Sequence, residues 1–317
     1  MKKLVFIFYL LVAFVVFAQQ ETFSIEYEKH RIGVFNPEKT IYHSLNPTKS
    51  EHITGYFREQ LAKTIFDAIK EKKIKIFDER KREISVESVE KRIVDFEKNN
   101  FNITLSKEQA LEYAIKFIGA YDFEEAVKYD YKDLCIEKKV LSYCPYMVRY
   151  RSFDENMDTL MLPLFWIFVS KNELALKNNA NNDSLFSIPD TIYSTLPLKY
   201  PVKMPFTLAL FSNVKEKKTN VFQSNGKEFK TMKEIDDLFV LSKSIGIYDE
   251  QSGKDVFQTI YSDIEPEDIE AVKIAENWSI NPYTLEICKK IQFYLPLYKY
   301  DEGIYRQIGF RIYNKRK

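Results

Sequence analysis

The spacing of apolar residues predicts three helices in the first third of the chain. Apolar side chains recur every three or four positions, as expected of helices with one buried face. Ser85 is placed to cap the second helix, and Ser106 with Gln109 forms a capping-box pattern before the third. Residues 75–78 predict a short strand between the first two helices. The apolar positions are Phe57, Leu61, Ile65 and Ile69; Val86, Val89, Ile93 and Phe96; and Leu111, Ala114, Ile115 and Ile118.

After residue 134 the pattern favours strands. Residues 134–150 and 163–169 are rich in aromatic and branched side chains, and residues 178–184 are polar and predict a loop. Prolines 189, 197, 201 and 205 are typical of edge strands. Asn225-Gly226 predicts a hairpin, and Thr231 with Glu234 is placed to cap a short helix. Helices followed by small, mostly antiparallel sheets indicate an α+β fold.

One strand pattern occurs twice. Residues 136–145 and 287–296 match without a gap at an offset of 151, and five of the ten positions are identical. In each copy one face is apolar, carrying Ile136 and Val140 in the first. We expect the other face to carry Lys139 and Tyr143, matched by Lys290 and Tyr294.

Two further matches support an internal repeat. Residues 74–79 resemble 245–250, and residues 125–128 match 270–273. Chance similarity of lysine-rich strands is the competing interpretation. The order of the matches favours two related modules, the first spanning residues 19–180 and the second, with a linker, residues 181–317.

The N-terminus has the pattern of an export signal. Lys2 and Lys3 precede an apolar run over residues 4–17, and Ala18 ends a cleavage pattern. The run is short for a membrane span, and we expect residues 1–18 to be removed and the protein to be periplasmic. The chain has 47 Lys and Arg against 46 Asp and Glu. A near-neutral balance argues against nucleic acid and anionic membranes as partners.

The residues that carry chemistry form no recognised motif. The sequence lacks the common zinc, nucleophile-elbow and phosphate-loop patterns, so we expect no enzyme, no metal and no cofactor. Asp154, Asn156 and Asp158 resemble the start of a calcium loop, but its glycine and final glutamate are missing. Cys135, Cys144 and Cys288 are odd in number, and burial as small apolar residues is favoured over a disulfide.

Several segments resemble the GldN (PorN) family of Bacteroidetes gliding motility and type IX secretion. Residues 268–281, followed by Lys290 and Pro296, resemble the family's Trp element and the strand after it. Tyr143-Cys144-Pro145 is similar to its Ile-Cys-Pro, and residues 164–168 to its Leu-Phe-Trp-Val-Phe strand. Residues 66–74 resemble its early helix and Gly-Lys-Ile turn, with Lys72 in place of the glycine.

The resemblance implies a non-enzymatic periplasmic ring subunit. It would assemble with an outer-membrane ring lipoprotein and contact the periplasmic part of an inner-membrane motor protein. Aromatic residues are enriched in interface cores, which makes Trp166, Trp278, Tyr146 and Tyr298 candidate interface anchors, with burial in the chain's own core as the alternative. Tyr143, Tyr294, Lys139 and Lys290 are candidates as the repeated strand motif.

Two other functions remain open at this point. A stand-alone periplasmic module that binds a small ligand or a glycan would have a concave pocket lined by aromatic residues. A hydrolase would have either a buried cluster of perturbed acids or a pair of histidines drawn from His30, His43 and His52.

Overall fold

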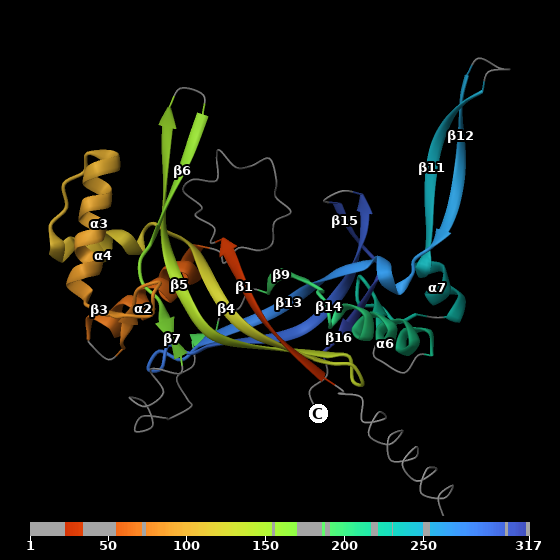
Figure 1. The fold of residues 1–317 in the computed structure, drawn as a ribbon, viewed down its shortest axis with the longest axis horizontal. Coiled ribbons are helices and arrows are strands. Elements are labelled where there is room, and N and C mark those ends of the chain that lie inside the picture. Colours follow the sequence, from red (N-terminus) through yellow and green to blue (C-terminus); the bar gives the residue numbers. More distant parts are fainter. Residues whose placement is uncertain are drawn as a thin grey trace, which may run out of the picture.

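The computed structural model describes residues 23–33, 55–71, 74–153, 156–169, 186–187, 191–216, 221–229, 231–249, 254–301 and 304–314. It contains two main antiparallel sheets, with helices near both ends of the molecule (Figure 1). The predicted α+β class is confirmed. The expected loop at 178–184 lies outside the described residues, as do His43, His52 and residues 1–18.

The first sheet is built around two long strands. Its order is β1-β4-β5-β6, and β7 also pairs with β5. Its strands are β1 (Phe23–Gly33), β4 (Ile118–Asp130), β5 (Cys135–Phe153), β6 (Asn156–Pro163) and β7 (Ile167–Phe168).

Three helices and a small hairpin cover one end of this sheet. The predicted caps form, because the Ser85 hydroxyl accepts a bond from the Ser88 backbone N–H and Ser106 makes a capping box with Gln109. The three predicted helices are observed, but the third ends at Ile115, and Ile118, expected in this helix, begins the next strand. The elements are α2 (Gly55–Lys70), the hairpin β2 (Ile76–Phe77) with β3 (Glu83–Ile84), α3 (Val86–Phe101) and α4 (Lys107–Ile115).

The second sheet has the order β10-β16-β14-β13-β8, with β9 also on β13 and β15 on β14. Its strands are β8 (Phe186–Ser187), β9 (Ile192–Pro197), β10 (Val221–Gln223), β13 (Ile269–Ile280), β14 (Ile287–Asp301), β15 (Ile304–Gln307) and β16 (Phe310–Tyr313). The other elements are α6 (Lys203–Lys215), α7 (Met232–Asp236), the 3-10 turns η4 (Asp237–Phe239) and η5 (Pro266–Asp268), and the hairpin of β11 (Val240–Asp249) and β12 (Lys254–Asp263). That hairpin projects from the body (Figure 1).

The hairpin predicted at Asn225-Gly226 is wrong in its strand pairing. A turn does form there, with Gly226 at φ +87°, but β10 pairs with β16 near the C-terminus. Turn residues specify local backbone shape, whereas the partner of a strand depends on the tertiary fold.

The central hairpins β4–β5 and β13–β14 have the same pairing pattern at an offset of 151. Ile118 opposes Met147 in the first, and Ile269 opposes Tyr298 in the second. The first hairpin has a β-bulge at Glu124/Glu125 and the second has one at the equivalent Ala275/Glu276. The turn of each hairpin has a leucine at positive φ, Leu134 in the first and Leu285 in the second. By this pairing Glu125 corresponds to Glu276. The sequence match of Glu125 with Glu270 is therefore out of register.

The bulge changes which side chains face the core. Because Ser142 opposes Glu124 and Val140 opposes Glu125, Leu141 is the extra residue, and side-chain alternation is interrupted there. Tyr143 consequently packs in the same core as Val140, instead of on the opposite face as predicted from strict alternation. Lys139 is exposed, whereas only 2% of the Lys138 side chain is exposed.

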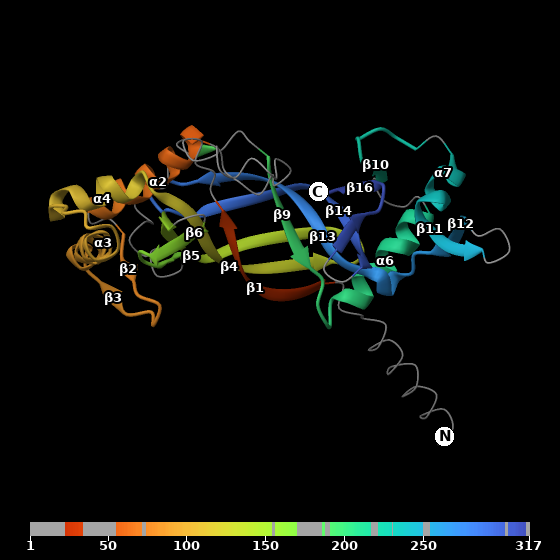
Figure 2. The ribbon, with the colours of Figure 1, turned by 90° about the horizontal axis from the view of Figure 1, so that it is seen from above.

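The two sheets share their cores. Trp278, Leu285 and Ile287 belong to the core formed with α2, α3 and α4, while Leu134 and Ile136 belong to the core of α6. The β4–β5 and β13–β14 hairpins run side by side along the long axis of the molecule (Figures 1 and 2). Each hairpin end thus completes the hydrophobic core of the other half.

Reciprocal hydrogen bonds join the same hairpins. The Tyr143 hydroxyl donates to the Leu285 carbonyl at 2.9 Å, and the Tyr294 hydroxyl donates to the Leu134 carbonyl at 2.8 Å. Burial raises the pKa of both phenols well above its usual value, so both remain protonated donors. Asn314 adds a bond in each direction to the backbone of Ile136.

A cluster of four charged side chains lies buried between the hairpins. Lys138 Nζ is 2.7 Å from Glu276 and 3.4 Å from Glu125, and Lys289 Nζ is 2.5 Å from Glu125. Desolvation opposes the charge on Lys138, but the two glutamates outweigh it and raise its pKa. Desolvation lowers the pKa of Lys289, which lies over the Phe123 and Trp278 rings. Two cations and two anions leave this interior neutral.

Candidate functional site

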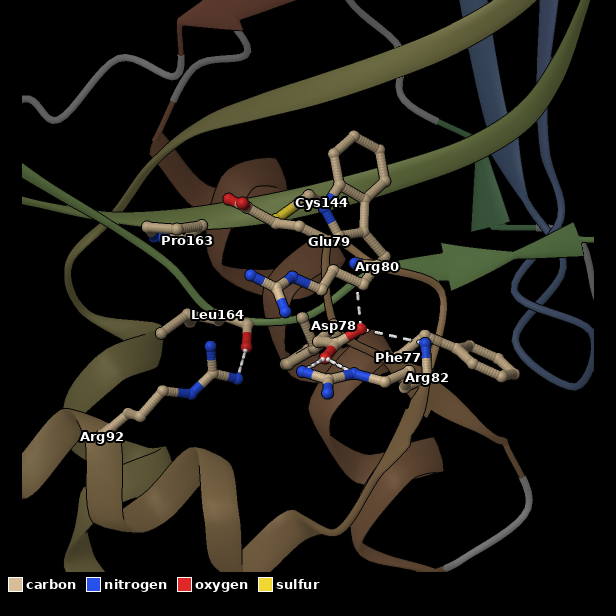
Figure 3. A pocket seen from close by; sticks show the side chains of 11 residues that line it. Phe77, Asp78, Glu79, Arg80, Arg82, Arg92, Cys144, Pro163 and Leu164 are labelled. Atoms are coloured by element: carbon tan, nitrogen blue, oxygen red, sulfur yellow. Dashed lines mark hydrogen bonds and ion pairs between the residues drawn. The ribbon is translucent and has the colours of Figure 1, made fainter.

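A cleft of about 350 Å³ opens beside the β2–β3 hairpin in the first half of the chain (Figure 3). It lies where this hairpin, α3, β5 and the segment before β7 meet. Its walls are residues 77–80, Arg82, Arg92, Cys144 and residues 163–166. The volume falls within the range of pockets that bind small ligands or side chains.

The β2–β3 turn is ordered by one carboxylate. Asp78 Oδ1 accepts backbone N–H bonds from Arg80 and Arg82, each at 2.9 Å, and Oδ2 accepts the Arg82 guanidinium bond at 2.7 Å. The hydrogen bonds from Arg82 hold the pKa of Asp78 below its usual value. Asp78 and Arg82 neutralise each other and shape the turn that presents Arg80.

Two aromatic residues also line the cleft. Phe77 and Trp166 form a β-bridge with N–O distances of 3.0 and 2.8 Å, and the Trp166 ring stacks on Phe168 at 6.2 Å. Burial raises the pKa of the neighbouring Cys144 thiol to about 12, so the thiol is protonated at neutral pH. Cys144 therefore contributes a small apolar wall and no thiolate.

Arg92 is the half-buried cation of the cleft. It lies on α3, and its Nη2 donates to the carbonyl oxygen of Leu164. Desolvation by burial lowers its pKa from the usual arginine value. Within the described part of the chain, neither Arg92 nor the exposed Arg80 forms an ion pair, and both point toward the Leu164 side of the cleft (Figure 3).

The charges of the cleft do not cancel. After Asp78 and Arg82 are paired, Arg80 and Arg92 face the single exposed carboxylate of Glu79. The arrangement offers guanidinium donors to an anion beside aromatic and apolar walls. The described residues contain no group of His, Cys, Asp or Glu with the geometry of a metal site.

Segments that carry the family resemblance converge here. Cys144 and residues 164–166 line the cleft, and Phe66 of α2 packs edge-on against Phe165 at 5.5 Å behind it. These segments are far apart in the sequence, and the fold brings them to one place.

A comparison with known families agrees with this location. The model of the family described as "Gliding motility associated protein GldN" matches residues 37–182, a range that contains every residue lining the cleft. Residues 37–182 belong to the GldN family. The GldN resemblance is thereby confirmed for this region, and the similar segment at 268–281 lies outside the matched range. No curated protein matches the chain.

The six aromatic candidates lie in the interior. Trp166, at 5% exposure, contributes to the cleft, and the Tyr146 hydroxyl donates to Asp122 at 2.8 Å. The Trp278 indole donates to Glu276 at 2.9 Å beside the charge cluster. Each packs within its own chain. The six are Trp166, Trp278, Tyr143, Tyr294, Tyr146 and Tyr298.

The two lysine candidates lie on the surface, and each is next to a lysine with a buried side chain. Lys139 and Lys290 are exposed, and the buried partners are Lys138 and Lys289. Applying the offset of 151 to Glu125 and Glu276 would have pointed to the buried cluster from sequence. No sequence pattern would have pointed to Arg80 and Arg92, because only the tertiary fold places them in one cleft.

Proposed function

We propose that this protein is a periplasmic structural component of a gliding-motility or type IX secretion machine. It acts by protein–protein assembly and catalyses no reaction. The observation that carries the proposal is the GldN match over residues 37–182. By resemblance, its partners are an outer-membrane ring lipoprotein and the periplasmic part of an inner-membrane motor protein.

The architecture supports a scaffold role. The chain comprises two related modules, residues 19–180 and 181–317, which descend from one folding unit. Their central hairpins share pairing, bulges and turn conformation at one offset. Because the modules exchange hairpin ends and share cores, they form one rigid body that can hold partners at a set spacing.

The location follows from the N-terminal export pattern. After removal of residues 1–18, the chain works in the periplasm and reaches the outer membrane through its lipoprotein partner. Among the described residues, no helix has both the length and the apolar character needed to cross a bilayer.

Purification from the native envelope tests the proposal. The full chain with a C-terminal affinity tag is extracted in mild detergent, and its mass and associated proteins are measured. We expect a large assembly that contains an outer-membrane lipoprotein. A tagged, unrelated periplasmic protein is the control, and recovery of this chain only as a free monomer would contradict the proposal.

The second candidate is a stand-alone periplasmic module that binds a small ligand or a glycan. The charged and aromatic cleft favours it, since Trp166 and Phe77 form one wall. It predicts a monomer in the same purification, with a small molecule retained by the protein.

A further inference from the structure

We propose that the cleft beside the β2–β3 hairpin binds a carboxylate-bearing peptide segment of a protein partner, with Arg80 and Arg92 as its donors. The inference rests on the proposed function, because it assumes that a protein occupies the site. The carboxylate belongs either to an acidic side chain or to a C-terminus, and the experiment below separates these sources.

The first argument is charge. Arg82 is already occupied by Asp78 at 2.7 Å, whereas Arg92 spends one donor on the Leu164 carbonyl and keeps the rest of its guanidinium for the cleft. A partly desolvated cation gains most from an anion that approaches it, and planar guanidinium groups match carboxylates in bidentate geometry.

The second argument is shape. The cleft volume of about 350 Å³ suits one or two side chains of an extended segment and is too small for a folded domain. Phe77, Pro163 and Trp166 line the same cleft as the two arginines and supply its apolar surface. The matching ligand has an acidic group beside an apolar one, as in other motifs read by arginine clusters.

The third argument comes from the second half of the molecule. Ile167 of β7 pairs with Tyr143, and Ile312 of β16 pairs with the equivalent Tyr294. The residue before each isoleucine is therefore also equivalent, so that Arg311 occupies in the second half the position of Trp166 in the first. Its guanidinium lies over Phe293 and Tyr313, at 4.7 and 4.9 Å from the ring centroids. Leu295 replaces Cys144 in the same correspondence. The chemistry of the cleft is thus specific to the GldN-matching half.

Peptide binding to the full purified chain tests the proposal. The probe is a fluorescein-labelled peptide, Leu-Glu-Phe-Asp-Leu-Glu with an amidated C-terminus, and binding is followed by fluorescence anisotropy. A second peptide carries Gln and Asn in place of the acids and ends in a free carboxylate, and a third is the same with an amidated end. We expect the first or second peptide to bind, which identifies the source of the carboxylate, and the third not to bind.

Variants then assign the donors. Because a charge-assisted hydrogen bond contributes roughly 1.5–3 kcal/mol, Arg80→Gln and Arg92→Gln should each weaken binding by about tenfold or more. Lys91→Gln is the matched control, since Lys91 is exposed on α3 next to Arg92, and it should leave affinity unchanged. Arg80 is exposed, so its variant remains informative if Arg92→Gln alters folding, which circular dichroism would reveal.

The outcomes separate the two proposals. Absence of binding by both carboxylate peptides, equal binding of the neutral amidated peptide, or unchanged affinity in Arg80→Gln overturns the carboxylate site. If that happens while the tagged chain still purifies in a large envelope assembly, the proposed function stands and only the docking site fails. Peptide binding by a chain recovered solely as a monomer would support the site and contradict the scaffold role.

Discussion

Four side chains, Glu125, Glu276, Lys138 and Lys289, decide how the two hairpins meet. A buried ion pair adds little net stability, because each charge loses its hydration on folding. Removing one partner is nevertheless strongly destabilising, because the other charge is then buried without compensation. Here the pairs also carry geometric information, since each lysine of one hairpin reaches a glutamate of the other. The cluster therefore selects one alignment of the hairpins over others that would bury the same apolar surface.

We expect Glu276→Gln to destabilise the protein by about 3–5 kcal/mol, because it leaves an uncompensated positive charge in the interior. Urea unfolding followed by tryptophan fluorescence measures the change. The control is Glu270→Gln, which removes a partly exposed ion pair with Lys203 and should cost at most about 1 kcal/mol. Equal effects of the two substitutions would show that the cluster is not electrostatically important.

Among the secondary-structure elements, β4 depends on a glycine where it passes β5. Gly119 lies between two register positions, Ile118 and Ala120, at a bulge. A Cβ atom at residue 119 would stand 2.6 Å from Cβ and Cγ2 of Val148. The Val148 Cβ is bonded directly to the backbone and cannot rotate away, so the two strands would have to separate.

Gly119→Ala should therefore destabilise the fold by about 1–3 kcal/mol through overpacking. Gly309→Ala is the comparison, because its new Cβ would meet only the flexible end of Leu238 at 2.9 Å and should cause a smaller loss. Differential scanning calorimetry of both variants gives the ranking. A Gly119→Ala protein as stable as the parent would mean that the β4–β5 crossing relaxes freely.

At the scale of the whole molecule, the two halves are mutually dependent. The hairpin end at Leu134 and Ile136 is covered by residues of the second half, and Trp278 and Leu285 are covered by the first. Each half contains its own helices and sheet, but its hydrophobic core is complete only when the hairpin end of the other half is packed into it.

We expect residues 19–180, produced alone, to aggregate or to lack cooperative unfolding, because the apolar hairpin end is then exposed to water. Co-expression with residues 181–317 as a separate chain should restore a soluble complex with native circular dichroism. The readouts are size-exclusion chromatography and thermal unfolding. Cooperative unfolding of a monomeric 19–180 fragment would contradict the shared-core interpretation.

The local structure of this protein could be predicted from its sequence. Helices α2, α3 and α4, with the caps at Ser85 and Ser106, follow from residue spacing and from hydrogen bonds within a few positions of the chain. The central strands could also be predicted from the sequence. So could the correspondence of residues 136–145 with 287–296, because similar sequences favour the same local backbone geometry. The GldN resemblance was likewise carried by short continuous segments of the sequence.

Which strand faces are buried, and where the cleft lies, depend on contacts between distant parts of the chain. A bulge at Leu141 placed Tyr143 in the core, which strict strand alternation does not predict. The cleft is lined by Arg80 and Arg92 together with Cys144 and Leu164, which are more than 50 residues away from both arginines in the sequence. The physical reason is that strand register and bulges are set by packing between distant segments, whose partners no local pattern identifies.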